Sequence, residues 1–182
     1  SDNAEQTRFA VQAYAGYVLA RSQQAPLGAL RSLFERRSDA RSGLSLVQLA
    51  IALQKMGDQP RADQALAAGL ALKRDDNQWF HDYGSVLRDD ALILALLHEH
   101  DLAAKQRDER LFTLADELAS RPYLSTQERN ALFLAGRGLL LEPEQDWQAE
   151  LSVGGQVRAL SHVDSGVKLA GAALAEPLTL SS

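Results

Sequence analysis

The sequence predicts a mainly α-helical fold, built from hairpins in which inner and outer helices alternate, followed by a short segment of β-strands. Hydrophobic residues make up 46% of the chain and aromatic residues only 6%, and alanine and leucine dominate, which favours packed helices. Helical segments that are apolar all round alternate with segments that carry a single apolar stripe. After Pro143 the hydrophobic period changes from the helical one to two.

The first part of the chain predicts four helices. The segment Phe9–Leu19 is apolar around most of its circumference, and Pro26 stands where a second helix would begin. The segment Leu44–Leu53 is again apolar nearly all round. Gly57 ends that helix, and Asp58 can cap the next one. The second and fourth helices carry single stripes, formed by Leu27, Leu30, Leu33 and Phe34 and by Ala62, Ala65, Leu66, Gly69 and Leu70.

Three more helices are expected up to residue 142, which makes seven in all. Ser85 caps a helix whose centre, Ala91–Leu97, is apolar without a break. Ser125 and Glu128 have the spacing of a capping box, in which the hydroxyl accepts from a backbone N–H and the carboxylate reaches back. The sixth helix has a stripe of Leu111, Leu114, Ala115 and Leu118, and the seventh one of Ala131, Leu132, Leu134, Ala135 and Leu139.

The order of these helices predicts how they stack. The helices expected to be buried begin near residues 8, 44, 86 and 126, a period of roughly 35–45 residues that is typical of stacked helical hairpins. Helices with one stripe lie between them and face water on their other side. This alternation suits either an open solenoid or a closed α/α ring.

The end of the chain, residues 147–182, reads as strands. Trp147, Ala149, Leu151 and Val153 alternate with polar residues, and Gly154-Gly155 is a plausible hairpin turn. Two further strands are indicated by Val167 and Leu169 and by Leu178 and Leu180, with Pro177 between them. About 36 residues of strand cannot bury a sandwich core alone, so the strands need the helices or partner strands that have been cut away.

Composition excludes several classes of function. The net charge of −5, with no run of lysine or arginine, argues against nucleic acid as a partner. There is no cysteine, so disulfides, zinc-thiolate sites and thiol nucleophiles are excluded for this chain. No apolar run approaches the roughly 18 residues of a membrane span, so we expect no direct membrane insertion.

Two histidine-containing segments are weighed as sites. His98-Glu99-His100 suggests a metal, but zinc on a helix requires histidines at i and i+4, and residues two apart diverge. At a helix C-terminus, histidine also complements the dipole. His81, with Asp82, lies in a loop among aromatic residues, which usually pin a loop onto a hydrophobic layer. We expect structural roles for all three histidines.

The other polar motifs also have structural explanations. Arg88-Asp89-Asp90 opens a buried helix, where aspartate is stabilised by the dipole and Arg88 can pair with a neighbouring helix. Glu117 and Arg121 are spaced as an i, i+4 ion pair. The segment Ser125–Glu128 has no histidine nearby to activate a nucleophile. We therefore expect no catalytic residues, no cofactor-binding residues and no metal site in this chain.

The order and spacing of five segments resemble the bacterial alpha-2-macroglobulins, of the alpha-2-macroglobulin and complement family. These segments are Asp82–Ser85, Arg88–Leu97, Leu114–Glu117, Tyr123–Arg137 and Trp147–Leu151. The resemblance covers most of residues 8–182 and is best from 79 to 151. It implies that 1–142 is the later half of a thioester-type α/α domain, a ring of the α/α-toroid type, and that 147–182 begins the β-sandwich that follows.

The resemblance also implies a function for the parent protein. Members of the family are large periplasmic proteins, often lipid-anchored, that take part in bacterial defence by trapping proteases. A protease cuts a bait segment of the parent. The parent then rearranges and holds the protease, by a thioester bond where one exists. The thioester joins a cysteine to a glutamine, so this chain cannot contain it. The fragment is expected to be a scaffold whose partners are other domains of the parent and, through the parent, target proteases.

Two other interpretations remain open. A tetratricopeptide-type interaction module is suggested by Leu49–Asp58 followed by Ala62 and Ala65, although the other hairpins do not keep its 34-residue period. An α/α-barrel enzyme would need paired acidic residues on inner helix ends, or metal ligands, and no convincing set is present.

Overall fold

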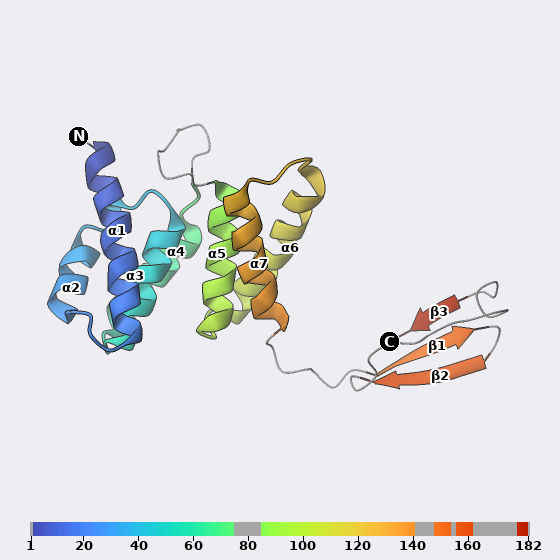
Figure 1. Ribbon diagram of the computed structural model, residues 1–182. Coiled ribbons are helices and arrows are strands. Elements are labelled where there is room, and N and C mark those ends of the chain that lie inside the picture. The colour runs from blue at the N-terminus through green and yellow to red at the C-terminus, as the bar shows by residue number, and fades with distance from the viewer. Residues whose placement is uncertain (1, 75–84, 141–147, 154–155, 162–177, 182) are drawn as a thin grey trace. The chain divides into compact units, whose positions relative to one another are not determined.

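The computed structural model describes residues 2–74, 85–140, 148–153, 156–161 and 178–181. The chain divides into two compact units, residues 1–140 and 141–182, and each is described here by itself. Seven α-helices and one 3-10 helix lie in the described part of the first unit (Figure 1). They are α1 (Asp2–Arg21), α2 (Leu27–Glu35), η1 (Arg37–Asp39), α3 (Gly43–Lys55), α4 (Gln59–Ala71), α5 (Val86–Glu99), α6 (Ala104–Ser120) and α7 (Thr126–Leu140).

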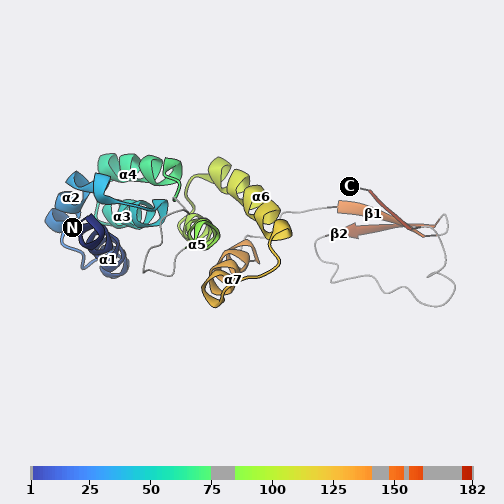
Figure 2. The same cartoon turned by 90° about the horizontal axis from the view of Figure 1, so that it is seen from above.

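The helices form two layers, as predicted. Helices α1, α3, α5 and α7 follow one another in one layer, and each packs on the next (Figure 2). Helices α2, α4 and α6 cover the other side, where α4 packs on α3 and α6 on α5. The mainly helical fold with alternating inner and outer helices is therefore confirmed.

Burial follows the layers. In α3, every residue from 43 to 53 except Gln48 is buried, and Leu49, Ile51 and Leu53 have no exposed surface. Seven residues of α5 are buried, including Leu94 and Leu97. In contrast, α6 buries only Leu114 among its described residues. The sequences that are apolar nearly all round, in α3 and α5, thus mark the helices at the centre of the array.

The two outermost helices of the inner layer are buried less than the two central ones. The apolar circumference of α1 indicated a buried helix and, in a chain that holds half of a ring, an exposed apolar flank; one stripe is buried, formed by Phe9, Ala13, Tyr17 and Ala20. Val11, Tyr14, Val18 and Leu19 are 42–62% exposed. Helix α7 likewise buries Ala131 and Ala135 and leaves Phe133 67% exposed. Each of these helices has an inner-layer neighbour on one side alone among the described elements, which explains the difference.

Local sequence explains several helix ends. Pro26 is the N-cap of α2, and Gly57 takes a φ of +87° directly after α3, a conformation that glycine adopts without strain. Asp58 is the N-cap residue of α4, as predicted, but its side chain makes no capping hydrogen bond. Its carboxylate instead accepts from Arg31 of α2 at 2.6 Å, because a charge-assisted bond to a guanidinium competes with the backbone N–H.

The second unit contains a small antiparallel sheet in its described part. Strand β1 (Gln148–Val153) lies between β2 (Gln156–Ser161) and β3 (Leu178–Ser181). Leu151 is buried and pairs with Arg158 on one side and Leu180 on the other, whereas Glu150 is exposed, as a period of two requires. The expected turn at 154–155 and the expected strand around 167–169 lie outside the described residues. Among the described helices, none is long and apolar enough to cross a membrane.

Candidate functional site

A polar network joins the N-termini of α5 and α7, and it contains the capping box that the sequence predicted. The Ser125 hydroxyl accepts from the Glu128 N–H at 3.2 Å, and Glu128 Oε2 accepts from the Ser125 N–H at 2.8 Å. The other carboxylate oxygen accepts from the Ser85 hydroxyl at 2.8 Å and from the Arg121 guanidinium at 3.1 Å. Ser85 also caps α5 by accepting from the Arg88 N–H at 3.1 Å. One buried carboxylate therefore serves two helix ends.

The environment of Glu128 stabilises its charged form. Burial by itself raises the pKa of this carboxyl, but the Ser125 N–H, the Ser85 and Ser125 hydroxyls and the Arg121 guanidinium together lower the pKa below its ordinary value. A glutamate held this way is ionised at neutral pH and accepts hydrogen bonds. It has no proton to donate, so the geometry fits a structural role that links two helix ends and not a general acid.

The expected ion pair between Glu117 and Arg121 is not formed. Helix α6 ends at Ser120, and Arg121 takes an extended conformation at the C-cap. Its side chain therefore leaves the face of α6 that carries Glu117 and pairs with Glu128 instead.

Asp89 and Asp90 occupy two further junctions around α5. Asp89 is 3% exposed and pairs with Arg74, just after α4, at 2.9 Å and with Arg88 at 2.7 Å. Asp90 pairs with Arg110 of α6, and Arg110 also donates to the Leu70 carbonyl of α4 at 2.6 Å. Burial raises the pKa of Asp90, and Arg110 opposes that rise. The motif Arg88–Asp90 thus ties α5 to the chain around α4 and to α6.

The side chains of His98, in the last turn of α5, and His100, at its C-cap, point in different directions, as their spacing predicts. The side chain of His98 faces α7, where a methyl group on Gly138 would lie 3.1 Å from the His98 Cβ. His100 faces α1: its Nε2 is 3.2 Å from the Tyr17 hydroxyl, and the two rings meet edge to face. No cluster of three metal-ligating side chains occurs in the described part of the chain. His81 and Asp82 lie outside that part.

The contact between Tyr17 and His100 belongs to a polar junction at the ends of α1 and α5. Arg21 donates to the Tyr17 hydroxyl at 3.3 Å and pairs with Glu99 at 3.0 Å. Burial lowers the pKa of His100, so the ring is neutral at pH 7. A neutral ring adds little to the helix dipole, and the hydrogen bond to Tyr17 is its main polar interaction. Burial also raises the pKa of the Tyr17 hydroxyl, which stays protonated.

Sequence reasoning missed two features of the packing around α4. The first is the double ion pair of Asp58, which binds Arg31 and Arg61 and links α2 to α4. The second is the approach of α3 and α4, where a methyl group on Gly43 would lie 2.1 Å from the Gly69 carbonyl oxygen. The glycines were visible in the sequence, but their pairing depends on the tertiary fold.

Searches for relatives give consistent results. No protein-family model matches the chain. The chain is 49% identical over 154 residues to an alpha-2-macroglobulin of Escherichia coli strain K12 and 44% identical over 163 residues to one of Xylella fastidiosa strain Temecula1. These matches cover 84% and 86% of this chain but 9% and 10% of the relatives. The chain spans about a tenth of the length of the curated relatives it matches.

Solved structures agree. A crystal structure of native E. coli alpha-2-macroglobulin, from domain MG7 to the C-terminus, matches with a TM-score of 0.74 and 47% identity over 87% of this chain and 25% of that chain. E. coli alpha-2-macroglobulin activated by porcine elastase matches with a TM-score of 0.75 and 41% identity over 100% of this chain and 15% of that chain. Salmonella alpha-2-macroglobulin reacted with methylamine matches with a TM-score of 0.73 and 46% identity over 87% of this chain and 10% of that chain.

Proposed function

Since the chain belongs to the bacterial alpha-2-macroglobulin family as a segment of a longer protein, we propose that it is the later half of a thioester-type helical domain together with the start of the following β-sandwich. The parent traps proteases in the periplasm and is anchored to the inner membrane by a lipid. The segment itself catalyses nothing. It is a scaffold that keeps its part of the domain rigid while the parent changes shape.

The observation that carries this proposal is the pattern of exposure at the two ends of the inner layer. Val11, Tyr14, Val18 and Leu19 of α1 are exposed together, and so are Phe133 and Leu134 of α7. Large apolar side chains gathered in this way normally mark an interface. A closed α/α ring offers one explanation for both ends, because further inner helices would cover α1 and α7 at the same time.

The polar junctions support the scaffold role. The carboxylates of Asp58, Asp89, Asp90 and Glu128 each hold an arginine of a different segment. In the pair of Asp89 and Arg74 both side chains are buried, and removing one partner from a buried pair costs about 3–5 kcal/mol because a buried charge is left alone. Such pairs fix the helices in one arrangement. The family matches also favour this interpretation over the tetratricopeptide-type module.

The ring is tested by supplying the missing half. The segment of the parent that precedes Ser1 is co-expressed with the 182-residue chain, and we expect a one-to-one complex on size exclusion. Tyr14→Glu should abolish it, because a carboxylate would enter an apolar interface. Phe112→Glu is the matched control, since Phe112 is even more exposed than Tyr14 (72% against 57%) but lies on the outer helix α6. A complex that tolerates Tyr14→Glu, or no complex at all, contradicts the ring.

Protease trapping is tested on the parent. The purified parent is incubated with elastase, and we expect the protease to elute in the fraction of the parent while it still cleaves a small peptide substrate. The 182-residue chain alone should leave elastase in its own fraction. Elastase that never elutes with the parent contradicts the trapping role.

A further inference from the structure

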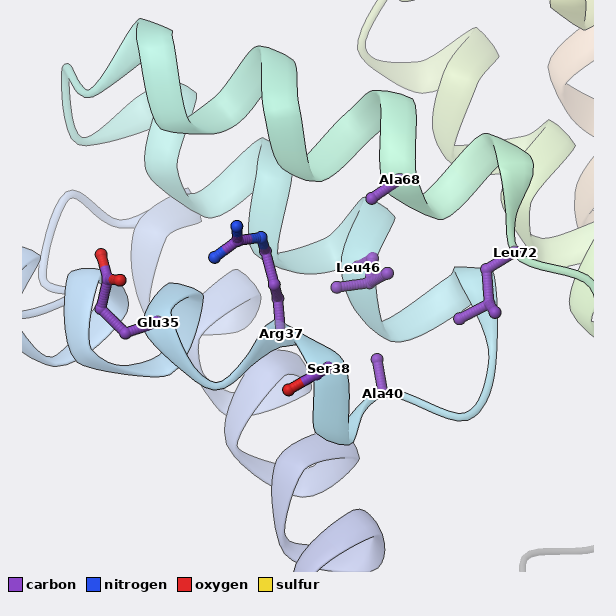
Figure 3. A pocket seen from close by; sticks show the side chains of 7 residues that line it. All are labelled: Glu35, Arg37, Ser38, Ala40, Leu46, Ala68 and Leu72. Atoms are coloured by element: carbon purple, nitrogen blue, oxygen red, sulfur yellow. The ribbon is translucent and has the colours of Figure 1, made fainter.

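A pocket opens on the outer face of the helical unit, between η1, α3 and α4 (Figure 3). Its volume of about 480 Å³ lies within the range of ligand pockets. Leu46, Ala68 and Leu72 form an apolar wall, and Ala40 completes it from the segment after η1. Leu46 is buried, whereas Ala68 and Leu72 are half-buried and reachable from solvent. None of the polar junctions described above includes these residues.

Arg37 places a positive charge beside this wall. Its guanidinium donates to the Phe34 carbonyl at 3.2 Å and stacks on the Phe34 ring at 4.4 Å from the centroid. Figure 3 shows the side chain extending from η1 toward α4, with Leu46 on one side and Glu35 on the other. The guanidinium is therefore held in place before any ligand binds.

Arg37 keeps hydrogen-bonding capacity in that position. A guanidinium has five N–H donors, and the interactions of Arg37 with the described residues use one of them. No described carboxylate pairs with Arg37, and the nearby Glu35 lies 3.9 Å from Arg61. Arg31 and Arg61, by contrast, are engaged with Asp58.

The residues that line the pocket carry one charge of each sign, Arg37 and Glu35, but the segment around them is basic. Residues 27–61 contain six lysines and arginines against three aspartates and glutamates, although the whole chain has a net charge of −5. The basic residues are Arg31, Arg36, Arg37, Arg41, Lys55 and Arg61. An inorganic anion would not use the apolar wall, and a purely apolar ligand would not use the guanidinium.

We propose that this pocket docks an extended peptide segment that carries an aliphatic side chain next to an aspartate or glutamate. The aliphatic side chain lies against Leu46, Ala68 and Leu72, and the carboxylate accepts hydrogen bonds from the free donors of Arg37. The segment comes from elsewhere in the parent, since the chain spans about a tenth of its relatives. Only the statement that the peptide belongs to the parent rests on the proposed function. The binding geometry depends on the pocket alone.

The first test uses a defined probe. A hexapeptide with a central Leu-Glu pair, acetylated and amidated so that the glutamate is its only carboxylate, is titrated into the 182-residue chain and followed by NMR. Shifted resonances are expected in η1 and in the C-terminal half of α4. Changing the leucine of the peptide to alanine, or its glutamate to glutamine, should weaken binding about tenfold or more.

The protein variants separate a specific site from general attraction. Arg37→Gln should weaken binding about tenfold. Arg36→Gln makes the same charge change at the neighbouring residue, which is bonded to Gln12 and does not line the pocket, and should leave the affinity nearly unchanged. Ala68→Leu fills the pocket and should abolish binding without altering the melting temperature by more than a few degrees.

Overlapping peptides that cover the rest of the parent then identify the segment. The peptides that bind should contain an aliphatic residue beside an acidic one and should fail on the Arg37→Gln variant. Three results would overturn the proposal. The first is an equal loss of affinity in Arg36→Gln and Arg37→Gln, and the second is binding that requires a free C-terminal carboxylate on the peptide. The third is the absence of binding by both the Leu-Glu hexapeptide and the overlapping peptides of the parent. Each of these results is independent of whether the parent traps elastase.

Discussion

The close approach of α3 and α4 at Gly43 predicts a large loss of stability from a single methyl group. In Gly43→Ala the new Cβ would lie 2.1 Å from the Gly69 carbonyl oxygen and 3.1 Å from the Leu72 carbonyl oxygen. Carbon and oxygen that are not bonded to each other cannot approach to 2.1 Å. Because the obstructing atoms belong to the backbone, no side-chain rotation relieves the clash, and α4 must move away from α3.

The magnitude follows from two opposing effects. Overpacking of a core typically costs about 1–3 kcal/mol, and a backbone obstacle places Gly43→Ala near the upper end. The gain in helix propensity from glycine to alanine is at most about 1 kcal/mol, and it is smaller here because Gly43 is the first residue of α3. We expect a net loss of about 2 kcal/mol, which lowers the melting temperature by roughly 4–8 °C in a chain of this size.

Gly136→Ala is the matched control. Gly136 lies inside α7, and a methyl group there meets nothing within 4 Å, so alanine should stabilise the helix by about 0.5–1 kcal/mol. Urea unfolding followed by far-UV circular dichroism measures both variants. If Gly43→Ala unfolds at the same urea concentration as the unchanged chain, or if both variants lose stability equally, the argument from the close approach is refuted.

Three further predictions concern burial and capping. Leu94→Ala should lower the free energy of unfolding by about 2–5 kcal/mol, because Leu94 has no exposed surface and the substitution leaves a cavity. Leu111→Ala should lower it less. Equal losses of the two variants in urea unfolding would contradict the two-layer assignment. Ser125→Ala should cost about 1 kcal/mol through the lost cap, and thermal melts identical to those of the parent chain would count against it. The lowered pKa of Glu128 contributes stability above the unfolded value of about 4.3, and this contribution is lost as the pH falls through the folded value. The urea midpoint should therefore fall on acidification, and fall less in Glu128→Gln; equal falls would exclude Glu128 as a cause.

Features set by neighbouring residues were predictable from the sequence. The unbroken apolar run at 91–97 identified a buried helix, and the spacing of Ser125 and Glu128 identified a capping box whose two hydrogen bonds are present. The alternation from 148 to 153 identified a strand. In each case, the interaction or the period is complete within about seven residues, so the pattern can be read without knowledge of the fold.

Features that join distant segments were not predictable in the same way. The second half of the Glu128 network comes from Ser85, which is 43 residues away. The bond between Tyr17 and His100 spans 83 residues. Glu117 is a plausible local partner for Arg121, but α6 ends at Ser120, one residue before Arg121. Arg121 pairs with Glu128 instead. The pocket beside Arg37 draws on η1, α3 and α4, and only their packing brings its walls together.

The shared carboxylate of Glu128 also couples the local opening of two helices. The N–H groups of Arg88, Ser125 and Glu128 are all satisfied within one chain of hydrogen bonds that passes through the Ser85 hydroxyl. If the first turn of α7 frays, Glu128 leaves Ser85, and the hydroxyl that caps α5 loses the acceptor that orients it. The amide hydrogens at the two helix starts should therefore exchange with solvent as one cooperative group, although 40 residues of chain separate Ser85 from Ser125.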